Sequence, residues 1–346
     1  MTSRERVLRC LEFNDPDRPP RHTWWLPVAT LEHGESAING FKDRWPDDIT
    51  IPGVPIPALV ALRDGDMYAA GIYRDEWGCL FENLQAGVIG EVKRPLLDDW
   101  SNLDALQLPE ACLQVDVAAV NATCRASDKF MLCDAYPRPF ERIQFLRGTE
   151  NVYMDLAEDA PELRELLRSV HDLNCRELEA WARTEVDGLV FIDDWGSQRG
   201  LLINPAQWRE RFKPLYADYI RIAHDAGKKA FMHSDGNISA IYEDLIEIGL
   251  DAVNSQLFCM DIEEIGRRCK GRLTFWGEID RQRILSTGSV ADTRNAVKRV
   301  ADALYDPAGG VIAQFEFGAG TRLANAHAVH EAWTDLHRTN KNTPLP

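Results

Sequence analysis

From about Val115 onward, short apolar runs alternate with longer segments in which apolar residues recur every three or four positions. An apolar run of roughly four to eight residues predicts a buried strand, whereas the longer spacing predicts an amphipathic helix. We expect strands at Phe130–Tyr136, Gly188–Trp195, from Lys229, Ala252–Ser255, Leu273–Ile279 and Val311–Phe317. We expect helices at Val115–Ala126, Pro139–Arg147, Asn151–Thr184 with a break at Pro161, Gln207–Ala226, Ile238–Ile248, Ile262–Cys269, Val290–Tyr305 and Ala328–Leu336. Strands that alternate with helices predict βα units around a parallel sheet.

The N-terminal third of the chain has a less regular pattern. Ser3–Phe13 has the spacing of an amphipathic helix, and Arg21–Leu26 has the composition of a first strand. Pro46–Pro57 is rich in proline and aspartate, which predicts a loop. Asp66–Val92 has residues of alternating character before and after Gly87, which predicts a β-hairpin that covers the rest of the fold as a lid.

These segments together predict an α/β protein with a single domain over residues 1–346. About eight βα units form a (β/α)8, or TIM, barrel, here with an N-terminal extension and the hairpin insertion at residues 66–92. Residues 338–346 form a polar tail after the last helix.

The chain carries a net charge of -16, and 45% of its 346 residues are hydrophobic. The acidic charge argues against non-specific binding to nucleic acid or to an anionic membrane surface. No apolar run approaches the roughly 18 residues of a membrane span, and the N-terminus lacks the apolar centre of a signal peptide. The cysteines are scattered without a CxxC pair, so we expect small buried side chains and no disulfide framework. We therefore expect a cytoplasmic protein, and the sequence is compatible with a homo-oligomer.

Polar side chains recur at the carboxyl ends of the expected strands, where barrels of this class carry their chemistry. They are Asp134 and Tyr136; Asp193, Asp194 and Trp195; His233 and Asp235; Asn254 and Gln256; Glu278 and Asp280; and Gln314 and Glu316. A charge at the end of an apolar strand is costly unless it is used or paired. The alternative for each residue is a helix cap or a salt bridge, and the recurrence of the pattern is what favours a site.

The candidates fall into three groups. His233 and Asp235 lie two residues apart on one strand and therefore face the same way, so they can share a metal ion or a substrate. The expected acid–base residues are Asp193, Asp194 and Glu278. The expected substrate-binding residues are Trp24, Trp77, Tyr136, Trp195, Asn254 and Gln256, although the tryptophans could equally be core residues.

Several segments resemble one known family from near the start of the chain to its last third. They are RERVLRCLEFNDPDRPP, RDEWGCLFEN, LRGTENVYMDL, DDWGSQRGLLINPAQWRERFKPLY, HSDGNI and LTFWGEID. Together they resemble the uroporphyrinogen decarboxylase superfamily, which includes methyltransferases that serve corrinoid proteins. The resemblance implies a (β/α)8 barrel but does not fix the reaction, since one fold hosts many activities.

The resemblance also implies a metal site with altered ligands. In the methyltransferases of this family, a His-x-Cys at the end of this strand and a later Cys bind zinc. His233 matches the histidine, Asp235 stands at the first cysteine, and Ala319 stands near the second. A histidine and a carboxylate still suit zinc or another divalent metal, and Glu316 on the last strand is the expected third ligand, preferred to Gln256.

Two principal functions remain open from the sequence. The first is a metal-assisted methyltransferase that moves a methyl group between a small substrate or tetrahydrofolate and a corrinoid protein. The second is a decarboxylase or other lyase that acts on a small carboxylated substrate by Asp/Glu acid–base catalysis. A third hypothesis is a catalytically inactive barrel used for binding. No DxHxxG corrinoid signature occurs, so any cobalamin would arrive on a separate corrinoid protein.

Overall fold

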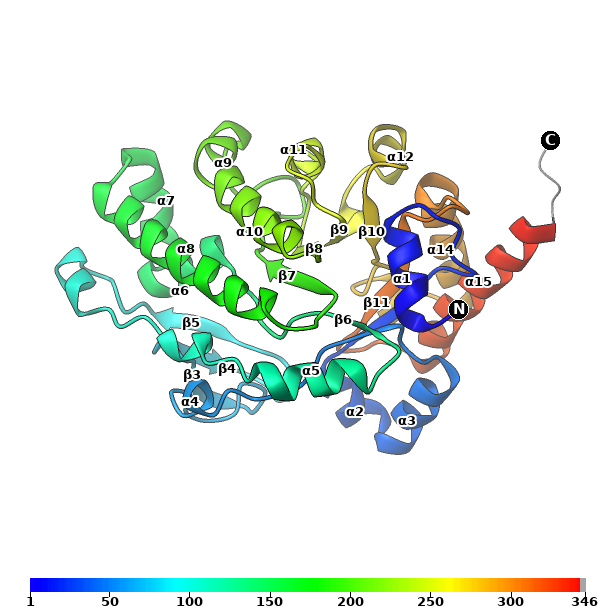
Figure 1. Ribbon diagram of the computed structural model, residues 1–346, viewed down its shortest axis with the longest axis horizontal. Helices are drawn as coiled ribbons and strands as arrows, with labels where there is room; N and C mark the ends of the chain where they lie inside the picture. The colour runs from blue at the N-terminus through cyan, green and yellow to red at the C-terminus, as the bar shows by residue number, and fades with distance from the viewer. Residues whose placement is uncertain (343–346) are drawn as a thin grey trace.

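The computed structural model describes the backbone of residues 1–342 and the side chains up to residue 338 (Figure 1). The last helix, α15 (Leu323–Asn342), extends through the first part of the expected polar tail, 338–346. The remainder of that tail, residues 343–346, lies outside the described residues.

A parallel sheet with the strand order β1-β11-β10-β9-β8-β7 forms the centre of the described structure. Its strands are β1 (Arg21–Trp25), β7 (Gly188–Ile192), β8 (Lys229–Ser234), β9 (Ala252–Ser255), β10 (Thr274–Trp276) and β11 (Val311–Phe317). Most apolar residues of β7 to β11 are buried on both faces, as expected for parallel strands covered by helices, whereas Trp24 and Trp25 of β1 are partly exposed. The register pairs His233 with Ile192 on one side and with Asn254 on the other, which sets neighbouring side chains at the carboxyl edge.

A second parallel pair, β2 (Ile49–Thr50) and β6 (Phe130–Met131), continues the curl of this sheet. An isolated bridge joins Leu132 to Gly188, and the Asp48 N–H donates to the Arg21 carbonyl over 2.8 Å. The protein is therefore an α/β fold with a curled parallel sheet.

Two expected boundaries in this region were wrong. The segment Pro46–Pro57, expected as a loop, contains β2. The expected strand Phe130–Tyr136 shortens to β6 with one further bridge at Leu132, because its partner strand β2 ends at Thr50.

Helices follow most of the parallel strands and cover the outer face of the sheet (Figure 1). They are α1 (Ser3–Leu11), α2 (Pro27–His33), α3 (Glu35–Arg44), α4 (Pro57–Val60), α5 (Val117–Arg125), α6 (Pro139–Arg147), α7 (Thr149–Glu158), α8 (Pro161–Ala182), α9 (Pro205–Arg211), α10 (Lys213–Asp225), α11 (Tyr242–Glu247), α12 (Ile262–Cys269), α13 (Ile284–Thr287) and α14 (Val290–Leu304), with short 3-10 turns at Trp100–Ala105, Glu110–Leu113 and Leu257–Cys259.

The helix expected at Asn151–Thr184 breaks before Pro161 as predicted. The helix expected at Gln207–Ala226 is instead divided into α9 and α10, because Pro214 is accommodated only in the first turn of a new helix. The helix expected at Ile238–Ile248 is shorter, since α11 begins at Tyr242.

The segment expected as a hairpin at 66–92 forms a three-stranded antiparallel meander rather than a two-stranded hairpin. Its strands are β3 (Gly71–Arg74), β4 (Leu80–Asn83) and β5 (Glu91–Arg94). The additional turn lies at Asp75–Gly78, where the Asp75 carboxylate accepts the Trp77 and Cys79 N–H groups. A buried ion pair of 2.6 Å between Asp75 and Arg142 ties the meander to α6.

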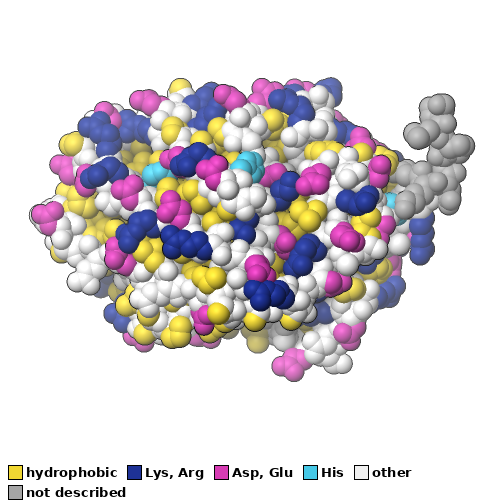
Figure 2. Space-filling model, viewed as in Figure 1, with side chains coloured by type: hydrophobic (Ala, Val, Ile, Leu, Met, Phe, Trp, Pro, Cys, Tyr) yellow, Lys and Arg dark blue, Asp and Glu magenta, His cyan; other side chains and the backbone are white. Residues whose placement is uncertain are grey.

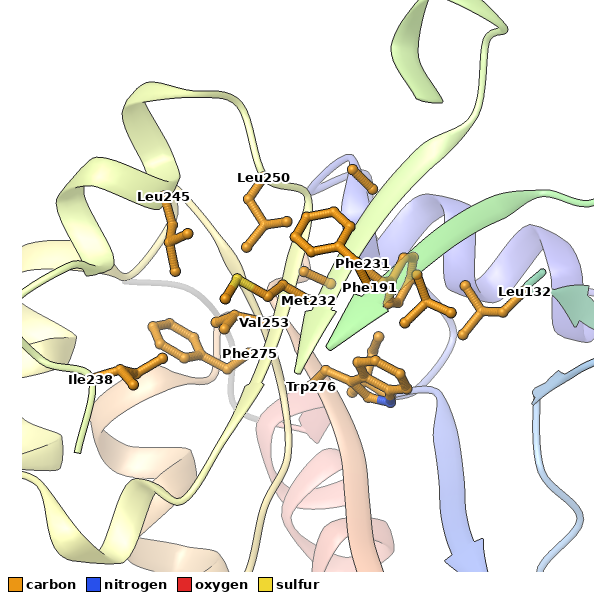
Figure 3. Packing of buried hydrophobic residues seen from close by; sticks show 14 of the residues in the cluster. Leu132, Phe191, Phe231, Met232, Ile238, Leu245, Leu250, Val253, Phe275 and Trp276 are labelled. Atoms are coloured by element: carbon orange, nitrogen blue, oxygen red, sulfur yellow. The ribbon is translucent and has the colours of Figure 1, made fainter. Parts of the chain in front are cut away.

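The hydrophobic core lies inside the curled sheet and between its strands and the helices. Figure 3 shows Phe231 and Trp276 packed together, and their ring centroids are 5.1 Å apart. Both side chains are almost completely buried, and burial of each ring stabilises the fold by roughly 1.5–3 kcal/mol. This rigid layer lies beneath the polar residues of the strand ends.

The surface carries interspersed basic and acidic side chains (Figure 2). Within the described residues, no helix has both the length and the apolar composition needed to span a bilayer.

Candidate functional site

His233 lies near the carboxyl end of β8, with its side chain 12% exposed. Its Nδ1 atom is 2.7 Å from Asn254 Oδ1. The Asn254 amide nitrogen faces the Trp276 carbonyl oxygen and donates to Gln314 Oε1 over 2.9 Å, so Oδ1 must be the atom that faces the histidine. Nδ1 therefore carries the proton, and the Nε2 lone pair is free to bind a metal ion or a substrate.

Two carboxylates converge on this free nitrogen. His233 Nε2 is 3.5 Å from Asp194 Oδ1 and 3.6 Å from Asp235 Oδ1. Asp235 Oδ1 is buried and has no hydrogen-bond partner among residues 1–338. The ligand atoms of the three residues lie within 4.8 Å of one another. One imidazole nitrogen and two carboxylate oxygens form a donor set that suits zinc or another divalent cation.

A close backbone contact brings the two carboxylates together. A Cβ atom on Gly236, which has a φ of +77°, would lie 2.0 Å from the Gly196 carbonyl oxygen. Only glycine permits this approach between the loops after β7 and β8. The Asp235 N–H also donates to Asp194 Oδ1 over 2.8 Å, which fixes the relative position of these loops.

Arg281 occupies the opposite side of Asp235. Its guanidinium bonds to Asp235 Oδ2, and its Nη1 donates to Glu316 Oε2 over 2.7 Å. Glu316 thus reaches Asp235 through Arg281, whereas Asp194 takes the position beside His233 that Glu316 was expected to occupy. A direct metal contact of Glu316 stays a prediction. Arg281 was not among the residues expected at the site, and its only signal in the sequence is a basic residue three positions after Glu278.

Glu278 is buried beneath Arg281. It is 2% exposed, and its Oε2 lacks a hydrogen-bond partner among the described residues. Arg281 Nη1 is 3.9 Å from that oxygen. Burial raises the pKa of Glu278 well above its ordinary value, and the nearby Asp235 carboxylate adds to the effect while Arg281 opposes it. The protonated form of Glu278 is therefore favoured by its surroundings, which is the property that a general acid requires.

The side chains of Asp193 and Trp195 point away from the cluster, into the helix layer. The fully buried Asp193 carboxylate accepts the Phe140 and Glu141 N–H groups, each over 2.7 Å, and the Tyr216 hydroxyl over 2.6 Å. It therefore caps α6, because such acceptors satisfy the first free N–H groups of a helix. Asp193 was expected in catalysis, and this position leaves it no surface for substrate.

Trp195 has a comparable packing role. Its ring stacks on Phe140 with centroids 4.0 Å apart, and its indole nitrogen donates to the Tyr216 hydroxyl. The side chain is 0% exposed, so the substrate contact expected for it is replaced by core packing.

Three other residues expected to bind substrate, Trp24, Asn254 and Gln256, lie around His233 at the carboxyl edge of the sheet. The Trp24 ring is 4.9 Å from the His233 ring and packs edge-on against it. Asn254 is fully buried and orients His233, while Gln256 Oε1 accepts the Gly236 N–H over 3.2 Å. Trp24 and Gln256 therefore flank the cluster, and Asn254 supports it from below.

Trp77 and Tyr136 line a neighbouring cavity of about 620 Å³. The cavity lies between the β3–β5 meander, the loop from β6 to α6, and α8. Ile192 forms part of its wall and pairs in register with His233 on the next strand. Because neighbouring strands lie about 4.8 Å apart, the cavity adjoins the cluster.

A family model described as uroporphyrinogen decarboxylase (URO-D) matches residues 77–336. No curated protein sequence gives a significant match to the chain.

Among solved structures, a methyltransferase from Methanosarcina mazei is similar with a TM-score of 0.67 and 15% identity, and the match covers 97% of this chain and 99% of that one. A 3-keto-D-glucoside 4-epimerase from E. coli has a TM-score of 0.40 and 14% identity, with 66% of this chain and 86% of that one covered. At 15% identity, the similarity to the methyltransferase shows a shared fold and nothing about the reaction. Since the family model spans most of the sequence, the chain belongs to the uroporphyrinogen decarboxylase (URO-D) family.

Proposed function

We propose that this protein is a metal-assisted methyltransferase that moves a methyl group between a small substrate or tetrahydrofolate and a corrinoid protein. The observation that carries the proposal is the convergence of Asp194 and Asp235 on the free Nε2 atom of His233. Membership of the URO-D family and the full-length fold similarity to a methyltransferase support it.

The proposed architecture is a single (β/α)8 barrel over residues 1–346, with the meander at 66–92 as a lid. Its eight parallel strands within the described residues would be the six of the main sheet together with β2 and β6. The bridge from Leu132 to Gly188 and the hydrogen bond from Asp48 to Arg21 support closure.

In this proposal His233, Asp194 and Asp235 hold zinc or another divalent metal. The bound metal supplies Lewis acidity that activates the methyl acceptor or donor. Asn254 keeps the His233 proton on Nδ1, and Arg281 holds one Asp235 oxygen so that the other points at Nε2. Glu278 keeps a proton in a buried position, where it can be given to a leaving group. The corrinoid would arrive on a partner protein, because the chain lacks a DxHxxG signature.

A decarboxylase or lyase acting on a small carboxylated substrate is the second candidate. One observation favours it: the buried Glu278, with a raised pKa, lies next to the Arg281 guanidinium. A substrate carboxylate could replace a protein carboxylate on Arg281, and Glu278 could then protonate the product carbanion.

Metal content and turnover together test the proposal. We expect purified wild type to contain a divalent metal, and His233→Ala and Asp235→Ala to lose it along with methyl transfer from folate or corrinoid donors. His224→Ala is the matched control, since His224 bonds to Asp251 elsewhere on the surface. If Glu316→Gln still contains the metal, Glu316 is not a ligand and the three converging residues alone hold the ion. Metal-free, fully active wild type would refute the metal role, and release of CO2 from a carboxylated substrate would support the lyase.

A further inference from the structure

The cavity beside the cluster has aromatic walls and an acidic lining. Figure 1 shows the meander and α8 on the same side of the molecule, and residues of both line the cavity. Its aromatic lining consists of Tyr68, Tyr73, Trp77, Phe81, Tyr136 and Trp181. Its volume of about 620 Å³ is within the usual range of roughly 300–1,000 Å³ for small-molecule sites.

Two arginines of the cavity wall, Arg142 and Arg63, form ion pairs with acidic side chains of the same wall. Arg142 pairs with Asp75 over 2.6 Å, and its guanidinium lies 4.7 Å from the Trp77 ring centroid. Arg63 pairs with Glu76 over 2.8 Å. Arg138 also lines the cavity and forms no ion pair within the described residues, so the lining holds four carboxyl groups against three guanidinium groups.

Two acidic side chains of the cavity lack such partners. In the described part of the chain, no Lys, Arg or His forms an ion pair with Asp134 or Glu177, and Glu177 makes no hydrogen bond either. Burial raises the pKa of Glu177 to about 8, an effect to which Glu76 adds, and burial also raises the pKa of Asp134. A cation bound in the cavity would therefore stabilise the charged form of both carboxyl groups.

One further polar group of the cavity wall lacks a partner. Trp181 lies four residues after Glu177 on α8, so the two side chains share a face of the helix. Trp181 is 1% exposed, and its indole N–H has no hydrogen-bond acceptor among the described residues. A buried donor without an acceptor is costly, so a ligand with an acceptor at this position would remove that cost.

We propose that this cavity binds a small organic ammonium ion, with the carboxylates of Asp134 and Glu177 as counter-ions and the aromatic walls around its alkyl groups. Aromatic faces attract such cations, and quaternary ammonium groups are commonly held in aromatic cages. The indole N–H of Trp181 selects a ligand that also carries a hydrogen-bond acceptor. That the ligand is a substrate rests on the proposed function, whereas the binding itself does not.

The test compares choline with 3,3-dimethyl-1-butanol, which has the same shape but no charge, by calorimetry on metal-free and metal-loaded protein. We expect choline to bind at least about tenfold more tightly than the neutral analogue, in both forms of the protein. Glu177→Gln and Asp134→Asn should each weaken choline by about tenfold without changing the neutral analogue. Glu179→Gln, on an exposed position of the same helix, is the matched control and should bind like wild type.

Several outcomes would overturn the cation site. They are equal binding of choline and its neutral analogue, no binding of either, or unaltered choline affinity in Glu177→Gln. Choline binding that disappears when the metal is removed would assign the cation to the His233 cluster and would also refute the proposal. Cation binding without any methyl transfer would leave this site intact and refute only the proposed reaction.

Discussion

The hydrogen bond from His233 to Asn254 gives the sharpest test of the metal cluster. Asn254→Leu keeps a side chain of similar shape but removes the acceptor that holds the Nδ1 proton. Loss of such a partner to a metal-binding histidine lowers affinity by roughly 10- to 100-fold, or about 1.4–2.7 kcal/mol. The variant also leaves the Trp276 carbonyl without its donor, which lowers the free energy of unfolding by about 1–3 kcal/mol.

The assay separates these two effects. Zinc affinity is measured by competition with a chelator, and stability by denaturant unfolding of the metal-free protein. Gln314→Leu is the control, because it removes another partner of Asn254 but leaves the bond to His233 in place. We expect Gln314→Leu to lose stability but keep zinc affinity within about threefold. A folded Asn254→Leu protein that binds zinc as tightly as wild type would refute the tautomer argument.

Three further predictions concern neighbouring buried groups. Asp193→Asn should lower the free energy of unfolding by about 1–3 kcal/mol through loss of the α6 cap and leave zinc affinity unchanged. Asp194→Asn should weaken zinc affinity and leave the free energy of unfolding nearly unchanged. Zinc titration and denaturant unfolding of both variants check this. The pKa of Glu278 is raised in the folded state, so its contribution to stability is complete below the ordinary pKa of 4.5 and is lost as pH rises above it. Glu278→Gln should therefore gain stability relative to wild type as pH rises above 4.5, measured by denaturant unfolding at several pH values. A constant stability difference across pH would contradict this. Arg142→Met should cost about 3–5 kcal/mol, because it leaves Asp75 buried and unpaired, and should expose the meander to limited proteolysis.

The sequence could predict the strand ends but not which of two adjacent acids faces the site. β7 is apolar on both faces, because helices cover one side and the core fills the other. Without alternation of apolar and polar residues, nothing in GLVFIDDW distinguishes Asp193 from Asp194. The pairing of His233 with Asp235 was predictable because residues two apart at the end of a strand share a face, and Asp235 directly follows β8.

The remaining features depend on contacts between distant segments. Asp194 joins His233 because two glycines allow neighbouring loops to touch, and Arg281 joins Asp235 to Glu316 across the sheet. The strand at Ile49–Thr50 was missed because two residues in a loop-like segment carry no periodic signal. Such contacts are set by register and loop geometry, which a single sequence does not reveal.

The presence of a carboxylate at Asp235, with no thiol in the cluster, has a consequence for oxidation. Peroxide attacks thiolates, and the Asp194, His233 and Asp235 cluster contains none. The cysteines all lie elsewhere, and burial raises the pKa of every one of them, so each stays a poorly reactive thiol. A cluster of this composition should keep its metal affinity through exposure to air or peroxide that would disable a cysteine-ligated zinc site.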